Sequence, residues 1–116
     1  RCHDRHRVHS DPLPLVGIQD VTSWVDYTGV ADAAVASGLE ILGYAPQAQF
    51  LLGGGLDLEL REFASLPTKT QIELSGQVKI LTLPDEMGEN FKCMALRRGA
   101  VPVPSAFRHA DRAHTL

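Results

Sequence analysis

The chain has 116 residues and a formal net charge of −3 at pH 7, with 44% hydrophobic and 22% charged residues. This is the composition of an ordinary globular protein, and the negative balance argues against a nucleic-acid-binding protein. Two cysteines are too few for a disulfide framework, and no apolar stretch reaches the roughly 18 to 20 residues that cross a bilayer, so we expect a reducing, cytoplasm-like compartment and no membrane span.

The chain opens on charged residues without an initiator methionine, which predicts a piece of a longer protein. Residues 1–19 are expected to be irregular, because Pro12 and Pro14 hold the residues before them in extended conformations. Residues 5–12 and 20–27 combine carboxylates, hydroxyls, histidines, arginines and an indole. Such a mixture is typical of side chains that line a cleft.

From Asp26 onward the pattern is regular. Asp26 is placed as the N-cap of a helix over about residues 27–37, and Gly38 is placed to end it. The expected apolar face of this helix consists of small side chains, Val30, Ala33 and Ala34. A strand over residues 39–45 follows, because a short and partly β-branched run lies between Gly38 and Pro46.

Apolar spacing then predicts three helices, over about residues 47–52, 56–66 and 69–83. Residues 68–71 have the form of a capping box, which places the start of the third helix. A turn over residues 84–89 leads into a last strand over residues 91–96, in which Cys93 is expected to be a small buried side chain.

The last part of the chain has no periodic apolar pattern. Residues 100–116 contain Pro102 and Pro104 and are otherwise polar or irregular, so we expect a disordered tail. The predicted organisation is therefore residues 1–99 as one portion of a folded domain, followed by this tail.

Several separated motifs occur in a fixed order within residues 5–99. They are His6-Arg7-Val8-His9-Ser10-Asp11-Pro12, Asp20-Val21-Thr22 with Val25-Asp26-Tyr27, Gln49-Phe50-Leu51-Leu52, and Met87-Gly88-Glu89 with Phe91-Lys92. In this combination the chain resembles the MidA-like family of S-adenosylmethionine-dependent methyltransferases. It departs from the family pattern at Trp24, where relatives often carry histidine or a smaller residue, and at Tyr27, where phenylalanine is commoner.

The resemblance implies an α/β fold, the C-terminal part of a class I (Rossmann-like) methyltransferase whose mostly parallel sheet ends in an antiparallel strand. Residues 39–45 would be the sixth strand and residues 91–96 the reversed seventh, with residues 47–83 as a helical insertion between them. The glycine-rich turn and acidic residue that hold the cofactor in this fold would lie upstream. Gly53-Gly54-Gly55 follow a short helix, so we expect a flexible junction there rather than a cofactor loop.

The resemblance also implies a function, S-adenosylmethionine-dependent methylation of arginine in a protein substrate. This chain would lack the cofactor-binding portion and be inactive alone. Mitochondrial members are associated with assembly of respiratory complex I and symmetric dimethylation of an arginine on one of its subunits, so a bacterial cytoplasmic location has the mitochondrial matrix as its alternative. The rival function is a non-catalytic interaction or assembly module, whose helices over residues 47–83 would dock a partner protein.

Six side chains are candidates for the substrate site of such an enzyme. Asp20 and Asp26 are assigned as catalytic, because a guanidinium is bound best by carboxylates. Asp26 has a helix cap as its alternative role, and Asp20 has a hydrogen bond to loop backbone. The side chains assigned to substrate binding are His6, His9, Thr22 and Trp24.

The histidines and the tryptophan each have another interpretation. With Cys2 and His3 the histidines would suggest zinc, but no second Cys/His pair follows at ligand spacing, so no metal ligand is assigned. No cofactor ligand is assigned either, because the resemblance places the cofactor site upstream. Trp24 would either fill the core between a loop and the sheet or form a wall against the aliphatic stem of a substrate.

Overall fold

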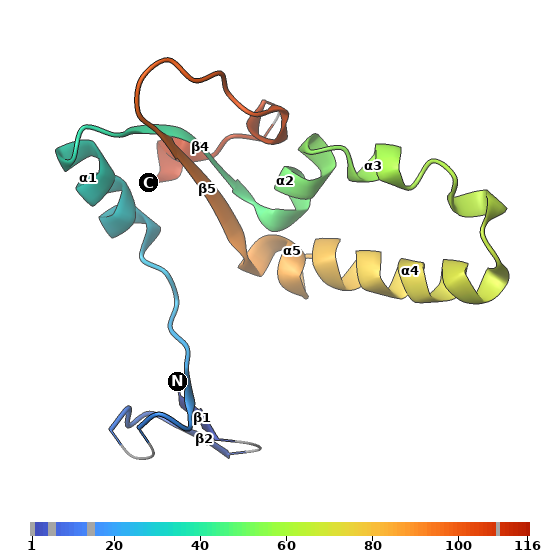
Figure 1. Cartoon of the computed structure of the whole chain (residues 1–116), viewed down its shortest axis with the longest axis horizontal. Helices are drawn as coiled ribbons and strands as arrows, with labels where there is room; N and C mark the ends of the chain where they lie inside the picture. The colour runs from blue at the N-terminus through green and yellow to red at the C-terminus, as the bar shows by residue number, and fades with distance from the viewer. Residues whose placement is uncertain (1, 5–6, 14–15, 109) are drawn as a thin grey trace.

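The computed structural model describes residues 2–4, 7–13, 16–108 and 110–116. They form a small N-terminal sheet, an extended segment, and a main body in which a two-stranded sheet has helices on two sides (Figure 1). The radius of gyration is 18.2 Å, whereas a compact domain of this length has about 13 Å. The chain is therefore open rather than spherical.

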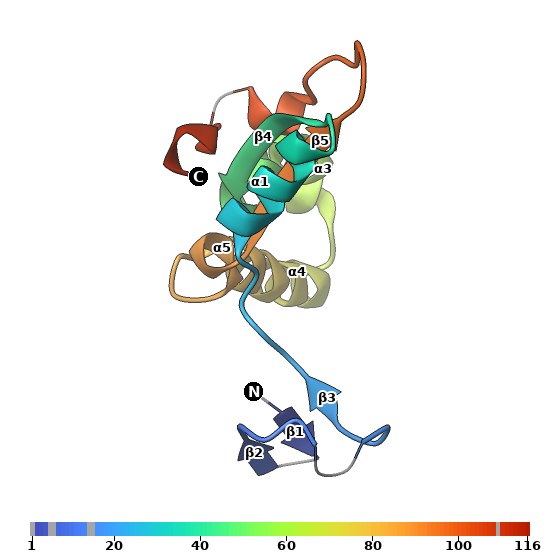
Figure 2. The same ribbon diagram turned by 90° about the vertical axis from the view of Figure 1, so that its left-hand side faces the viewer.

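The N-terminal sheet contains β1 (Cys2–Asp4), β2 (Arg7–His9) and β3 (Asp20–Val21), in the order β2-β1-β3 with antiparallel pairing. The prediction that residues 1–19 are irregular is therefore wrong for β1 and β2. Strands of three residues are too short to show an alternating pattern, and they form here through backbone pairing. Figure 2 shows that one extended stretch of chain joins this sheet to the main body.

The first long helix, α1 (Tyr27–Ala36), begins and ends as the sequence predicts. The Asp26 carboxylate accepts a hydrogen bond from the Gly29 N–H at 3.0 Å, and Gly38 follows the helix with φ of +74°. The apolar face is different, because Ala31 and Ala34 are buried while Val30 and Ala33 are exposed. The helix packs against β4 (Glu40–Pro46) along that alanine face.

The central sheet pairs β4 with β5 (Lys92–Arg97). The strands are antiparallel, in register from Glu40 opposite Arg97 to Pro46 opposite Lys92, with an irregularity between Ile41 and Gly43. Both predicted strands are confirmed to within one residue, and so is the reversed direction of the second. Glu40 and Arg97 also form an ion pair of 2.6 Å.

Between these strands lies a run of helical elements: α2 (Gln47–Gly53), α3 (Leu56–Glu59), the 3₁₀ turn η1 (Phe63–Ser65), α4 (Thr68–Thr82) and α5 (Met87–Asn90). The helix predicted over residues 56–66 is broken, because the chain leaves helical geometry at Leu60. The predicted capping box is also wrong. Pro67 is the N-cap, and the Gln71 side chain donates to the Leu66 carbonyl at 2.8 Å instead of reaching the cap.

The core lies where the C-terminal segment, defined as residues 100–116, meets the central sheet. Ala45, Ala106 and Phe107 are buried together, and the partly buried hydrophobic side chains around them are Phe50, Cys93 and Ala95. Phe107 belongs to the 3₁₀ turn η2 (Ser105–Phe107), and a second such turn, η3 (Ala113–Thr115), contacts β4. The expectation of a disordered tail is therefore wrong for η2, since Phe107 is only 3% exposed.

Phe107 packs so closely because β4 carries no side chain beneath it. A Cβ atom at Gly43 would overlap the Phe107 ring, and one at Gly53 would lie 2.7 Å from the Ala106 carbonyl oxygen. The ring of Phe107 also meets that of Phe50, with centroids 5.2 Å apart. Two glycines and an aromatic pair thus fix the C-terminal segment to β4 and α2.

Candidate functional site

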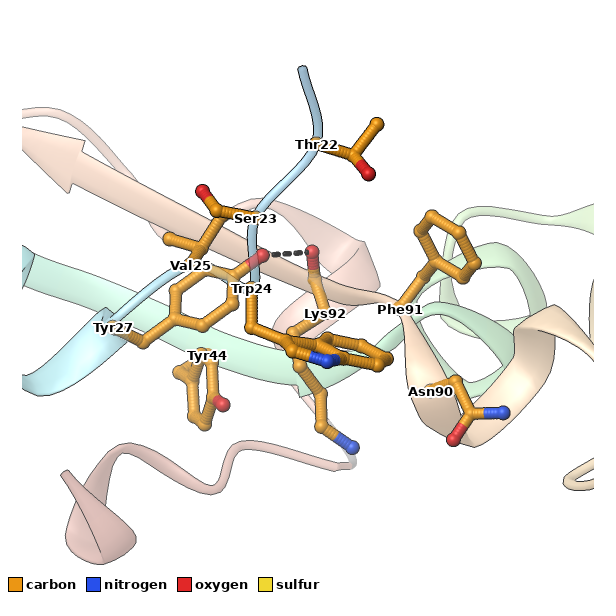
Figure 3. Close-up of a pocket in the computed structure, with 9 residues that line it drawn as sticks. All are labelled: Thr22, Ser23, Trp24, Val25, Tyr27, Tyr44, Asn90, Phe91 and Lys92. Atoms are coloured by element: carbon orange, nitrogen blue, oxygen red, sulfur yellow. Dashed lines mark hydrogen bonds between the residues drawn. The ribbon is translucent and has the colours of Figure 1, made fainter. Parts of the chain in front are cut away.

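A pocket of about 770 Å³ lies between the extended segment that follows β3 and the central sheet. Its lining comes from three parts of the chain: Thr22, Ser23, Trp24, Val25, Tyr27, Tyr44, Asn90, Phe91 and Lys92 (Figure 3). The lining carries four aromatic rings and one charged group, the Lys92 ammonium. An apolar pocket with a few polar groups at its edge is the usual form of a ligand site.

One wall of this pocket is a fixed pair of tyrosines. The Tyr27 hydroxyl donates to the Lys92 carbonyl at 2.7 Å, which ties the start of α1 to the start of β5. The ring of Tyr27 lies 5.1 Å from that of Tyr44, at an interplanar angle of 51°. Burial, followed by the neighbouring Tyr44 and Cys93, raises the pKa of the Tyr27 phenol above its ordinary value of 10.0.

The opposite side of the pocket is open. Trp24 is 83% exposed and Phe91 is 52% exposed, so neither ring is part of the core of this chain. The core interpretation of Trp24 therefore does not hold here, and its exposed indole lies in the lining of the pocket (Figure 3). A planar side chain that is this accessible is suited to packing against a ligand.

The single cation in the lining is held by an acid outside it. Lys92 Nζ bonds Glu89 Oε1 at 3.0 Å and also donates to the Glu89 backbone carbonyl. Arg112 Nη1 reaches the same Glu89 oxygen at 2.7 Å. Hydrogen bonds from Lys92 and then Arg112 hold the pKa of the Glu89 carboxyl below its ordinary value of 4.5.

Two of the six side chains predicted from the sequence, Thr22 and Trp24, line the pocket. Asp20 lies on β3, exposed and opposite His3 in the strand register, and is not part of the lining. Asp26 caps α1 through its hydrogen bond to Gly29.

The two histidines lie apart from the pocket or cannot be placed. His9 is half-buried on β2, in the N-terminal sheet. His6 lies outside the described residues. Among the residues that are described, no group of three or more His, Cys, Asp or Glu side chains could hold a metal ion.

Sequence reasoning did not find Tyr44, Asn90 or Lys92 as pocket residues. Phe91-Lys92 belongs to one of the motifs quoted above, and that motif is the signal that could have pointed to Lys92 as a site residue. Tyr44 carries no such signal, because its place in the pocket depends on the pairing of β4 with β5, which local pattern does not show.

The glycines of residues 53–55 do not fit a cofactor loop. Gly53 is the last residue of α2 and packs on Ala106, while Gly55 precedes the four-residue helix α3 with φ of +103°. They serve as the end of one helix and the turn into the next, which confirms the interpretation as a helix junction. Within the part of the chain that the structure describes, no helix is long and apolar enough to cross a membrane.

Comparison with known proteins gives a consistent result. Residues 1–45 match the family model of candidate S-adenosyl-L-methionine-dependent methyltransferases. The fold is similar to two crystal structures from Burkholderia thailandensis that belong to one superfamily. One is a candidate methyl transferase bound to S-adenosyl-homocysteine, at 37% identity and a TM-score of 0.82. The other is an uncharacterized protein, at 38% identity and a TM-score of 0.83.

These two alignments include 99% of this chain but only 30% and 31% of the respective solved chains. No protein with a curated description matches the chain. The matches support the broad family of S-adenosylmethionine-dependent methyltransferases, and an α/β chain with a small sheet and helices similar to those of the solved structures.

Proposed function

We propose that this chain is the C-terminal part of a MidA-like S-adenosylmethionine-dependent methyltransferase. One observation carries the proposal: a structure that is 37% identical over 99% of this chain is bound to S-adenosyl-homocysteine. That molecule is what S-adenosylmethionine becomes when it has given up its methyl group. We propose S-adenosylmethionine as the cofactor of the whole protein.

The cofactor site would lie on another part of the fold. The solved chains are about three times as long as the part matched here, and the glycines of residues 53–55 are used in a helix junction. The chain at hand would therefore contribute the last strands of a Rossmann-like sheet and one side of the substrate site, and would not transfer methyl groups alone.

The proposed substrate is an arginine side chain of a protein. A guanidinium is a permanent planar cation, and a carboxylate can bind it with two parallel hydrogen bonds. Within the described residues, the exposed Asp20 carboxylate forms neither a hydrogen bond nor an ion pair, whereas Asp26 is engaged in capping α1. This difference supports Asp20 as the residue that receives the guanidinium, and the pocket around Trp24 as a neighbouring contact surface.

The test compares Asp20→Asn with Asp26→Asn in the whole protein. Asparagine keeps the shape of aspartate and loses its charge, and it is nearly as good an N-cap. We expect Asp20→Asn to reduce methyl incorporation into an arginine-containing protein at least tenfold, with the melting temperature unchanged, because the substrate cation loses its counter-charge.

Asp26→Asn is the matched control, and it should leave both methyl incorporation and melting temperature close to those of the unchanged protein. Full turnover by Asp20→Asn would remove this residue from the site. A collapse of turnover for Asp26→Asn at normal stability would reverse the two roles.

A non-catalytic interaction module is the second candidate, and one feature favours it. No residue of α4 is buried, and Ile72 on α4 and Leu58 on α3 are 69% and 62% exposed. Large apolar side chains at such exposure are suited to a partner protein. Binding of a partner by a whole protein that lacks methyl transfer would favour this candidate. For either function we propose a bacterial cytoplasmic location, with the mitochondrial matrix as alternative.

A further inference from the structure

The C-terminal segment contacts residues of the pocket lining without lining the pocket itself. Its first contact is with the backbone of Tyr44. The Tyr44 N–H donates to Asp111 Oδ1 at 2.9 Å, and the Tyr44 carbonyl accepts from the Arg112 N–H at 2.6 Å. Asp111 Oδ1 also accepts from the Ala113 N–H at 3.0 Å, which fixes the carboxylate in place. Both backbone groups of one pocket residue are therefore satisfied by residues 111 and 112.

The second contact reaches the only cation of the pocket lining. Arg112 Nη1 and Lys92 Nζ share one oxygen of Glu89, at 2.7 and 3.0 Å. Glu89 belongs to α5, a helix of only four residues, so its side chain is oriented mainly by these two partners. Arg112, which does not line the pocket, is thus linked through the Glu89 carboxylate to the Lys92 ammonium, which also bonds the Glu89 backbone carbonyl.

The two contacts come from adjacent residues and reach two different walls. Tyr44 stands on β4 and Lys92 on β5, and both line the pocket. A shift of residues 111–112 would move the tyrosine backbone and release the acid that holds the lysine. Neither Asp111 nor Arg112 needs to touch a ligand to have this effect.

We propose that Asp111 and Arg112 are positioning residues of the substrate site, which they act on through Tyr44 and through the Glu89–Lys92 pair. The proposal rests on the proposed function, in that the pocket contacts the protein substrate of a methyltransferase. In this proposal Arg112 fixes the position of the Lys92 ammonium through Glu89, and Asp111 fixes the position of the Tyr44 backbone through its hydrogen bond to the Tyr44 N–H. The C-terminal segment would therefore affect how well the substrate is held and leave the methyl-transfer step itself unchanged.

The experiment measures steady-state methylation by the whole protein with four changes: Arg112→Ala, Arg112→Lys, Asp111→Ala and Arg108→Ala. Arg112→Ala should raise KM for the protein substrate about two- to fivefold, the range of an exposed charge pair, with kcat and KM for S-adenosylmethionine unchanged. Arg112→Lys keeps a cation and should recover most of the affinity. Arg108→Ala is the control, because Arg108 is exposed and its side chain has no hydrogen bond or ion pair to the described residues.

A second measurement reports on the pocket without any turnover. In protein labelled with ¹⁵N at indole nitrogens, the Trp24 signal is assigned by its loss in Trp24→Phe. Arg112→Ala and Asp111→Ala should each shift this signal, and Arg108→Ala should leave it in place. This measurement keeps the inference testable even if the unchanged protein shows no methyl transfer, an outcome that would reject the proposed function alone.

The inference fails if Arg112→Ala and Asp111→Ala leave both KM and the Trp24 signal unchanged. It also fails if they lower kcat and raise both KM values together with a fall in melting temperature, because that pattern describes a general loss of folding. A rise in KM for the protein substrate that Arg112→Lys reverses would support it.

Discussion

The N-terminal region, taken as the described part of residues 2–26, and the C-terminal segment, residues 100–116, both have structures that their sequences do not indicate. The N-terminal region is dense in polar side chains and contains Trp24, yet it forms a small separate sheet and an extended stretch in which Trp24 is 83% exposed. The C-terminal segment has no periodic pattern, yet it supplies Phe107, one of the most buried side chains of the chain.

This contrast shows that only some of the packing in a fold can be predicted from its sequence. Periodicity reveals an element that packs along one face, whereas a single side chain that fills a gap in a distant strand leaves no pattern around it. Phe107 fits over Gly43, and only the folded chain brings the two together. A segment can therefore appear unstructured in the sequence and still close the core.

The largest expected effect tests directly whether the two regions differ in how tightly they are packed. Phe107→Ala should lower the free energy of unfolding by about 3 to 5 kcal/mol, the cost of removing a buried aromatic ring. Trp24→Ala is the matched change in the N-terminal region, and it should alter this free energy by less than about 0.5 kcal/mol because the indole is exposed. Urea denaturation of both variants measures the difference. Equal effects would show that the two regions are packed alike.

The next effect concerns the β4 side of the contact between Gly43 and Phe107. Gly43→Ala places a methyl group against the Phe107 ring and should destabilise by about 1 to 3 kcal/mol. Gly76→Ala is its control, because Gly76 lies inside α4 with no atom within 4 Å of an added Cβ, and it should stabilise by about 0.5 to 1 kcal/mol.

A double change then tests whether Gly43 and Phe107 are coupled. Most of the cost of Gly43→Ala should disappear in a Phe107→Ala background, since the ring that it would overlap is gone. Purely additive effects would mean that the strain at Gly43 has another source.

The third effect concerns the hydrogen bond that ties the start of α1 to the start of β5. Tyr27→Phe removes the hydrogen bond to the Lys92 carbonyl and should cost about 1 to 2 kcal/mol, because the carbonyl is left without that partner. Tyr44→Phe should cost less, since no hydrogen bond of the Tyr44 hydroxyl occurs among the described residues. A melting-temperature comparison of the two variants decides the point, and a larger loss for Tyr44→Phe would contradict it.

The smallest effect is a pH dependence of the free energy of unfolding. The pKa of Glu89 is lowered in the folded chain, so the unfolded chain binds its proton more readily. The stabilisation from this carboxylate is complete above about pH 4.5, the ordinary value, and is lost as the pH falls through the lower folded-state pKa. Its size should stay below about 1 kcal/mol, because the side chain is 45% exposed and water screens it. Glu89→Gln should flatten the loss of stability below pH 4.5, and an unaltered curve would exclude the contribution.

The sequence predicted elements whose signals are local. The helices α1, α2 and α4 and the strands β4 and β5 begin and end within one residue of the expected positions, because caps, glycines and prolines mark their ends. It failed for the three-residue strands, for the helix broken at Leu60, and for Phe107. The strands are too short to show a pattern, and the burial of Phe107 depends on contact with Gly43 and Ala45, which are distant in the chain.

The candidate site was predicted in the same uneven way. Thr22 and Trp24 stand in the pocket as the polar segment suggested, and the roles of Asp20, Asp26 and the histidines stay predictions. Tyr44 could not be chosen from the sequence, since pairing of β4 with β5 is what brings it to the pocket. Lys92 belongs to a motif that the sequence shows, but the sequence did not assign it to the site.

The bonds between Tyr44 and residues 111–112 have one more consequence, which concerns aggregation. An uncovered strand offers its N–H and C=O groups to any other chain that can extend the sheet. At Tyr44 both groups point away from β5 and are already occupied by Asp111 and Arg112. The chain thus blocks strand addition at this point of β4 with its own C-terminal segment, and a protein that lost this segment would expose a site where sheets of separate molecules can join.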